Sequence, residues 1–382
     1  MSKSINVPKL RFKEFNGEWE EKQLGKIATF YNSKRIPLTE IDRIKGEYPY
    51  YGASGIIDYV KDYIFDGEYI LLGEDGANIV MRNSRLAFLA KGKFWVNNHA
   101  HIFQAKDSNT FLCEALERIN YTKYNTGTAQ PKLNSDVVKK IKLLVPLKQE
   151  QEKIASFLTS VDTKIEQLTK KEELLQQYKK GVIQKIFNQE IRFKADDGSE
   201  FCDWEEKSLN ELVEFSNGKA HENDIDESGD YIVVNSKFIS SNGTVKKYSN
   251  SQIAPLYKND IVMVMSDVPN GKALSKCYLI DENNKYTLNQ RICSLRQTIN
   301  NNKFLIYLIN RNKYYLAFDS GVGQTNLRKD EVLNLKLKVP CLEEQNKIAN
   351  FLSSIDCKIE QTQKQLESSK EFKKALLQQM FV

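Results

Sequence analysis

The sequence predicts an α+β protein in which one plan is used twice, a mostly β domain with some helix followed by a long helix. Two observations support this prediction. The stretch from Val145 to Phe187 returns as Val339 to Phe381, at a constant shift of 194 residues without a gap. Both copies also carry apolar residues at the heptad spacing of a coiled-coil helix. A repeat of this length decides the architecture before any single motif does.

The repeat extends beyond the helices. Leu-Arg-Phe at 10–12 is answered by Ile-Arg-Phe at 191–193, and WEEKQLGKI from Trp19 is answered by WEEKSLNEL from Trp204. The segments 33–120 and 220–315 hardly resemble each other, but TGTAQPKL at 126–133 is answered by SGVGQTNL at 320–327. Each half is therefore a head, a variable body, a shared loop and a long helix.

The bodies show the pattern of short strands with a helix near the end. Apolar runs stopped by glycine turns, and later runs in which apolar and polar residues alternate, are typical of strands. We expect strands within 67–76, 94–105, 258–271 and 286–297, and helices within 111–120 and 303–318.

Each long helix follows a proline, Pro146 or Pro340, which suits a helix start. Forty residues would make a rod of roughly 60 Å. Neither helix can bury its apolar seam alone, so the simplest partner of each is its own copy; the alternative is two ordinary amphipathic helices on separate domains. The predicted seam consists of Ile154, Leu158, Val161, Ile165, Leu168, Ile348, Leu352, Ile355, Ile359 and Leu366. The predicted segments are 1–145, 146–188, 189–339 and 340–382.

Composition favours a cytoplasmic protein without a membrane segment. No apolar run approaches the ~18 residues of a membrane span, and the first residues lack a secretory signal. Six cysteines are scattered without a CxxC pair, which indicates a reducing compartment. Residues 1–147 hold 22 basic and 17 acidic side chains, and residues 191–341 hold 20 of each, so charge alone is a weak argument for nucleic acid.

Motifs for catalysis are missing. The chain has no Pro-Pro dipeptide to hold a flipped base, no glycine-rich loop opening a helix and no Walker sequence. The matches to Asp-x-Lys at Asp162 and Asp356 lie on the long helices, where residues two apart diverge. His99 and His101 would share one strand face as a possible metal pair, but no third ligand is near in sequence. The chain is therefore interpreted as a reader or scaffold and not as an enzyme.

The bodies carry side chains suited to DNA. Lysine and arginine suit phosphates and guanine, and amides suit base edges. A loop expected at 48–60 mixes aromatic residues, glycines and Ser54, and the Gly-x-x-Gln-x-x-Leu loops at 127–133 and 321–327 are either DNA readers or structural turns. The predicted DNA-binding residues are Lys34, Arg35, Tyr51, Ser54, Arg82, Asn98, His99, Gln130 and Lys132 in the first body, and Lys219, Lys237, Asn270, Lys272, Gln290, Arg291, Gln324 and Arg328 in the second.

Across its full length the chain resembles the specificity subunit of type I restriction–modification systems. The resemblance rests on VPLKQEQEKIASFL and VPCLEEQNKIANFL, the paired WEEK heads and the paired loops at 126–133 and 320–327. The duplicated Pro-x-x-x-Glu-Gln-x-Lys-Ile-Ala signature places Glu150 and Gln151 in the first copy and Glu344 and Gln345 in the second.

The resemblance implies that each body is a target-recognition domain reading one half of a split double-stranded DNA sequence. It implies that the long helices pack antiparallel as a spacer. Two modification subunits would bring S-adenosylmethionine and adenine N6-methylation, and restriction/translocase subunits would use ATP with Mg. The chain itself would bind no cofactor and no metal.

Because the bodies differ, the physical expectation is an asymmetric bipartite target with half-sites about one helical turn, ~34 Å, apart. Two alternatives stay open at this point. One is a free-standing DNA-binding regulator, which would have to bind tightly alone. The other is a self-contained restriction or modification enzyme, which the missing motifs disfavour.

Overall fold

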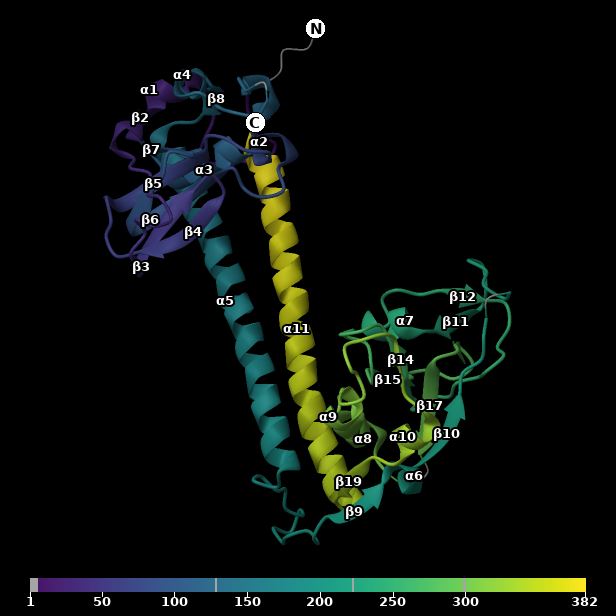
Figure 1. Ribbon diagram of the computed structural model, residues 1–382. Coiled ribbons are helices and arrows are strands. Elements are labelled where there is room, and N and C mark those ends of the chain that lie inside the picture. The colour runs from purple at the N-terminus through teal and green to yellow at the C-terminus, as the bar shows by residue number, and fades with distance from the viewer. Residues whose placement is uncertain (1–5, 128, 222, 298–299) are drawn as a thin grey trace. The chain divides into compact units, whose positions relative to one another are not determined.

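The computed structural model describes residues 6–127, 129–221, 223–297 and 300–382 (Figure 1). Its contacts divide the chain into two compact units. Unit 1 comprises residues 1–170 and 363–382, and unit 2 comprises residues 171–362. Each unit therefore contains a segment of both long helices. The four predicted segments, from 1–145 to 340–382, stay predictions.

Unit 1 is built on a six-stranded sheet with the order β2-β7-β5-β6-β3-β4. All neighbours are antiparallel except β3 and β6, which are parallel. Helix α3 packs on the sheet, and its buried side chains join the main core of the unit. The sheet strands are β2 (Ala28–Phe30), β3 (Lys45–Gly52), β4 (Gly55–Val60), β5 (Phe65–Gly73), β6 (Ala87–Val96) and β7 (Ala100–Ala105). The other elements are β1 (Glu20–Gln23), which pairs with β8 (Lys142–Val145), and α1 (Leu24–Ile27), α2 (Asn78–Met81), α3 (Asn109–Glu117) and α4 (Ser135–Lys139).

Two sequence expectations for unit 1 differ from the structure. The expected loop at 48–60 is mainly the hairpin β3–β4, because its Tyr, Ile and Val residues favour strands, and only residues 53–54 turn. The expected strand at 94–105 is interrupted by a turn at 97–99, so it contributes to both β6 and β7. His99 therefore lies in a turn and does not share a strand face with His101.

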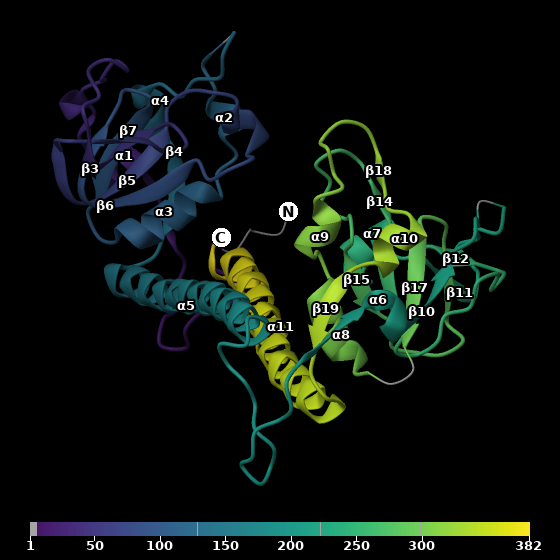
Figure 2. The ribbon, with the colours of Figure 1, turned by 60° about the horizontal axis from the view of Figure 1, so that its bottom comes forward.

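Unit 2 contains a four-stranded sheet of order β10-β17-β13-β15 and a three-stranded sheet of order β12-β11-β16. In Figure 2, β10 and β17 lie side by side. The strands are β9 (Glu205–Ser208), β10 (Val213–Asn217), β11 (Tyr231–Val234), β12 (Tyr248–Ser249), β13 (Ile261–Val264), β14 (Ser266–Asp267), β15 (Cys277–Leu279), β16 (Tyr286–Leu288), β17 (Ile292–Gln297), β18 (Thr325–Asn326) and β19 (Lys336–Val339). The short helices are α6 (Leu209–Leu212), α7 (Ser236–Ser240), α8 (Asn302–Ile309), α9 (Lys313–Leu316) and α10 (Lys329–Leu333).

The two long helices are present as predicted, α5 (Lys148–Phe187) and α11 (Leu342–Met380). Nine of the ten predicted seam residues are buried, and Ile165 is half-buried. The seam continues through Val182 and Ile186 in unit 2 and through Leu376 and Met380 in unit 1. The apolar stripe of each helix is therefore covered, as the heptad pattern requires.

Ion pairs between α5 and α11 follow the internal repeat. In unit 1 Lys373 pairs with Asp162 at 2.6 Å, and in unit 2 Lys179 pairs with Asp356. At the shift of 194 residues, Asp162 corresponds to Asp356 and Lys179 corresponds to Lys373. The ion pair of unit 1 is therefore the repeat equivalent of the ion pair of unit 2. In each unit a segment of α5 is therefore paired with a segment of α11, and the internal repeat relates the two pairings.

The Glu-Gln signature at the start of each long helix anchors the head of its half. Glu150 is 1% exposed and accepts hydrogen bonds from Arg11 Nε at 2.8 Å, Arg11 Nη2 at 2.7 Å and Trp19 Nε1 at 3.3 Å. Glu344 accepts the same set from Arg192 and Trp204. A buried carboxylate needs such partners because an unpaired one is costly. The signature glutamate therefore holds the start of each long helix against the head of the same half.

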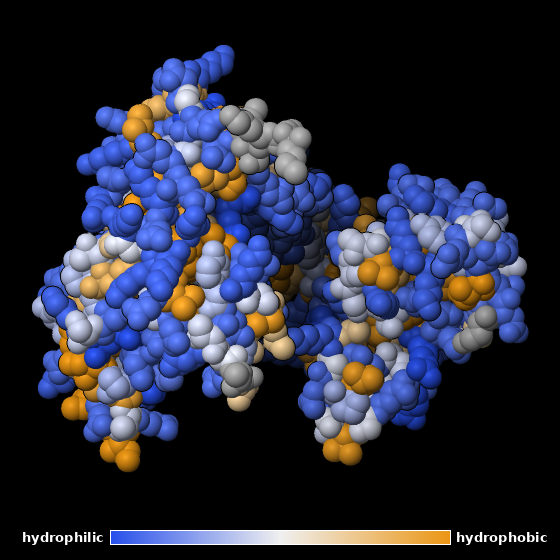
Figure 3. Space-filling model, turned by 90° about the horizontal axis from the view of Figure 1, so that it is seen from above, coloured by the Kyte–Doolittle hydropathy of each residue, from blue (hydrophilic) through white to orange (hydrophobic). Residues whose placement is uncertain are grey.

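No helix in the described ranges is long and apolar enough to cross a membrane. On the face seen in Figure 3, apolar patches are small and surrounded by polar side chains.

Candidate DNA-recognition surfaces

In unit 1 a turn and a loop meet at the end of the central strand β5. The N–H of Glu74 donates to the carbonyl of His99 at 2.8 Å, and the carbonyl of Glu74 accepts from the N–H of Leu133 at 2.7 Å. Asp75 also forms an isolated bridge with Lys132. The strand end therefore holds the turn 97–99 on one side and the repeated Gly-x-x-Gln-x-x-Leu loop on the other.

Four of the predicted residues come together at this strand end: Asn98, His99, Gln130 and Lys132. His99 is 52% exposed at its side chain and its Nδ1 lies 2.8 Å from Asp75 Oδ2. Lys132 Nζ lies 3.6 Å from Glu74 Oε1, with its side chain 48% exposed. Asn98 and Gln130 are exposed on the turn and the loop. We call the hydrogen-bonded arrangement of Glu74 with His99 and Leu133 the frame. The four predicted side chains present donors and acceptors to solvent from this frame.

The predicted arginines of unit 1 are instead held inside the domain. Arg35 Nη1 lies 2.7 Å from Glu74 Oε2 and also donates to the carbonyls of Asn98 and Ala100. Arg82 pairs with Glu117 at 3.0 Å. These contacts hold the turn at 97–99 and the helix α3, so Arg35 supports the surface without being free at it.

The remaining predicted residues of unit 1 lie apart from the strand end. Tyr51 is half-buried and its ring contacts Phe88 and Phe94. Ser54 is exposed in the turn of the β3–β4 hairpin, and exposed Lys34 lies over the ring of Tyr31. Their assignment to DNA stays a prediction, as does that of every predicted contact.

Unit 2 repeats the same frame at the end of β13. The N–H of Met265 donates to the carbonyl of Arg291 at 2.9 Å, and the carbonyl of Met265 accepts from the N–H of Leu327 at 2.7 Å. Met265 thus replaces Glu74, and Arg291 replaces His99. At the neighbouring bridge Ser266 and Asn326 stand where unit 1 has Asp75 and Lys132. The frame is common to both units, and the side chains on it are not.

Several predicted residues of unit 2 gather around this frame. Arg291 is exposed with a φ of +68°, and Lys219 bridges Asn289 while its carbonyl accepts from the N–H of Gln290. Gln324 Nε2 donates to Ser266 Oγ at 2.6 Å, and the N–H of Asn270 donates to Asp319 Oδ2 at 3.2 Å.

Three further predicted residues of unit 2 are exposed. Lys237 lies on α7, Lys272 lies in the segment after β14, and Arg328 precedes α10, where it pairs with Glu331 at 2.7 Å. Arg328 directly follows Leu327, whose N–H belongs to the frame at the end of β13, whereas no described contact ties Lys237 or Lys272 to that frame.

Sequence reasoning missed the acidic residues of both frames, namely Glu74, Asp75 and Asp319. Glu74 and Asp75 position Arg35, Lys132 and His99 in unit 1. The available signal was Glu-Asp-Gly directly after a buried strand, where a turn brings side chains to the sheet edge.

Three buried titratable groups, His101, Cys113 and Cys293, are held in their neutral forms. His101 is fully buried; its Nε2 donates to the carbonyl of Leu133 at 2.7 Å, and its Nδ1 accepts from Asn32 at 3.0 Å. Burial lowers the pKa of His101, which favours the neutral ring. Burial also raises the pKa of the Cys113 and Cys293 thiols to about 12, so neither is an activated nucleophile. Among the described residues, no group of three or more metal-ligating side chains is found.

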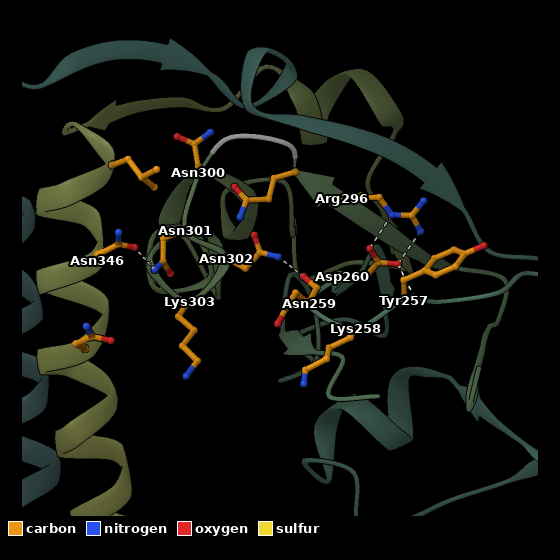
Figure 4. Close-up of a pocket in the computed structure, with 13 residues that line it drawn as sticks. Tyr257, Lys258, Asn259, Asp260, Arg296, Asn300, Asn301, Asn302, Lys303 and Asn346 are labelled. Atoms are coloured by element: carbon orange, nitrogen blue, oxygen red, sulfur yellow. Dashed lines mark hydrogen bonds and ion pairs between the residues drawn. The ribbon is translucent and has the colours of Figure 1, made fainter. Parts of the chain in front are cut away.

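A polar pocket of about 820 Å³ lies elsewhere in unit 2 (Figure 4). Asp260 accepts two hydrogen bonds of 2.8 Å from Arg296, which also lies over the ring of Tyr257. Asn301 donates to Asn346 at 2.7 Å. The lining is thus largely occupied by its own contacts, and none of the predicted DNA-binding residues contributes to it.

Known proteins of one family are similar to this chain. Residues 16–176 and 202–368 match the type I restriction modification DNA specificity domain. The MjaVIII type I restriction enzyme specificity subunit of Methanocaldococcus jannaschii is 25% identical over 403 aligned positions, covering 96% of this chain and 94% of that one. A Haemophilus influenzae relative is 34% identical over 146 residues, which make up 38% of this chain and 37% of that one.

A solved structure shares the fold over nearly the whole chain. The type I restriction–modification S subunit from M. genitalium superimposes with a TM-score of 0.67 at 18% identity, covering 98% of this chain and 99% of that one. The α+β fold with two domains and coiled-coil helices, and the family resemblance carried by the duplicated signature, are both confirmed. The chain belongs to the type I restriction–modification specificity family, with two DNA specificity domains in one polypeptide.

Proposed function

We propose that each unit of this specificity subunit reads one half of an asymmetric bipartite DNA target. The observation that carries the proposal is the common frame with unlike side chains. Unit 1 presents Asp75, His99 and Lys132 where unit 2 presents Ser266, Arg291 and Asn326. A shared frame suits a shared way of docking on the duplex, and different donors and acceptors suit different bases.

The chemistry of these side chains separates the two half-sites. A carboxylate such as Asp75 accepts from the amino group of cytosine, whereas an arginine such as Arg291 donates to O6 and N7 of guanine. One good paired contact is worth about 1–3 kcal/mol of discrimination against the wrong base. Asn98, Gln130 and Gln324 add exposed amides that can read adenine.

The coiled coil offers two similar contact sites, which suit two copies of one partner, and we propose that this partner is the modification subunit. Tyr178 on α5 is 52% exposed and Phe372 on α11 is 51% exposed, and the shift of 194 residues relates them. Each is followed by two lysines, of which the first is paired across the coil. Exposed aromatic residues are typical anchors of protein interfaces, and repeat-related anchors fit the same protein twice.

On this proposal the chain is the non-catalytic reader of the assembly. The modification subunits bind S-adenosylmethionine and methylate adenine, and restriction/translocase subunits use ATP with Mg. This chain contributes base recognition and the coiled coil on which the others assemble.

The test is a genome-wide map of methyladenine in cells carrying this chain with its modification partner. Arg291→Ala should relax or change one half of the methylated motif and leave the other half intact. Lys285→Ala is the matched control, since Lys285 pairs with Glu282 away from the frame. A change in both halves would contradict the division into two readers.

The enzyme and regulator alternatives have a separate test. Methylation or cleavage of DNA by the purified chain alone would support a self-contained enzyme. Tight sequence-specific binding by the chain alone, without any modification subunit, would support a free-standing regulator.

A further inference from the structure

Unit 1 contains a groove lined by basic and apolar side chains. It has a volume of about 730 Å³ and lies between α3 and the paired segments of α5 and α11. Ile165 and Leu377 line it as partly buried apolar side chains at the edge of the unit 1 core. We call this feature the α3 groove.

The rim of the α3 groove carries uncompensated positive charge. Its two carboxylates are already paired, Glu114 with Arg85 at 2.9 Å and Glu117 with Arg82 at 3.0 Å. Arg118, Lys370 and Lys374 also line the groove. No described carboxylate lies within ion-pair distance of these three, so the groove suits an anionic occupant.

The equivalent position in unit 2 is filled. Glu117 accepts from the N–H groups of Leu86 and Ala87, and Asn310 accepts from the N–H of Cys277 in the same way. Because Glu117 and Asn310 make equivalent hydrogen bonds, α3 and α8 occupy equivalent positions in the two units. Glu114 lies three residues before Glu117 and Tyr307 lies three residues before Asn310, so Tyr307 is the equivalent of Glu114.

In unit 2 the side chain of Tyr307 fills the position that is the α3 groove beside Glu114 in unit 1. Its hydroxyl donates to Asp356, and Lys179 Nζ lies 5.4 Å from the centre of its ring. Asp356 and Lys179 are the repeat equivalents of Asp162 and Lys373. The repeat also places Gln176 where unit 1 has Lys370, which lowers the positive charge.

We propose that the α3 groove binds an acidic segment of the modification subunit, with an apolar side chain seated on Ile165 and Leu377. Because Tyr307 occupies the equivalent position in unit 2, the two copies of the modification subunit are held unequally. The inference rests on the proposed function. A protein segment fits better than nucleic acid, since a phosphate backbone has no group for an apolar floor.

The experiment measures stepwise binding of the modification subunit to the full-length chain by calorimetry, at low and at high salt. The wild-type chain should bind two copies in unequal steps, and the tighter step should weaken as salt rises. Glu114→Tyr copies the residue of unit 2 into the groove and should make the two steps alike.

A second variant leaves the core untouched. Lys370→Glu with Lys374→Glu should weaken the tighter step about tenfold, since rim charges act through complementarity. Lys180→Glu is the matched control, because Lys180 is the repeat equivalent of Lys374 in unit 2 and should leave the tighter step unchanged.

Unchanged steps in both groove variants would overturn the inference, as would equal steps in the wild-type chain. Weaker binding of double-stranded DNA, with partner binding unchanged, would overturn it in favour of a nucleic-acid contact. A wild-type chain that binds no modification subunit at all would instead refute the proposed function.

Discussion

Replacing Glu150 with glutamine should destabilise unit 1 by about 2–4 kcal/mol. The side chain of Glu150 is 2% exposed and that of Arg11 is 13% exposed, so their pair is shielded from solvent. Glutamine keeps the shape and one acceptor oxygen, but its NH₂ group faces a guanidinium N–H. A hydrogen bond to a charged group is worth about 1.5–3 kcal/mol, and breaking a buried ion pair costs about 3–5 kcal/mol.

The expected value lies between these limits because Arg11 keeps two carbonyl partners, those of Asn16 and Gly17. For a unit of this size, each kcal/mol lowers the melting temperature by about 2–4 °C. We therefore expect a decrease of roughly 4–16 °C in the transition that involves unit 1.

The assay combines scanning calorimetry with hydrogen exchange, which assigns the loss to one unit. Glu150→Gln should increase exchange around Trp19 and the start of α5, and Glu344→Gln should do so around Trp204 and the start of α11. Glu152→Gln is the control, since its side chain is 54% exposed and its ion pair with Lys148 is open to solvent. A Glu150→Gln variant as stable as Glu152→Gln would refute the docking role of the signature.

Other predictions test the coiled coil and the buried histidine. Leu158→Asp should destabilise unit 1 by about 3 kcal/mol or more, because it places an unpaired carboxylate at a fully buried position; unchanged thermal unfolding would contradict this. Asp162→Lys should weaken the pairing of α5 with α11, and adding Lys373→Asp should restore most of the loss, as a double-mutant cycle would measure. Burial lowers the pKa of His101, so the unfolded chain takes up its proton first. Stability present above the unfolded pKa of about 6.5 should be lost as the pH falls toward the folded pKa. His101→Gln should flatten this dependence in unfolding curves measured at several pH values, and an equally steep curve would count against it.

The long helices could be predicted because their signal is local and repeated. The seam from Ile154 to Leu168 is periodic over consecutive turns, and its burial follows directly from that periodicity. The turn at 97–99 was missed because apolar and polar residues alternate on both sides of it, although Asn97 and Asn98 are typical turn residues and Asn97 Oδ1 accepts from the N–H of His99 at 2.8 Å.

The candidate surfaces were only partly predictable, for a different reason. Sequence reasoning selected exposed cations and amides by type, so it chose His99 and Arg291 together with Arg35. Whether an arginine is free depends on a carboxylate distant in sequence, as Glu74 is from Arg35. Likewise Glu150 belonged to a recognised signature, but its partner Arg11 lies 139 residues away.

The membership of the last residues in unit 1 has a consequence for how the protein is made. Leu376, Met380 and Phe381 belong to the core that also contains Trp19 and Phe111, and the N–H of Leu10 donates to the carbonyl of Gln379. The ribosome must therefore translate residues 363–382 before unit 1 can close its core. A stop codon directly after residue 362 should damage unit 1, although most of that unit lies before residue 171.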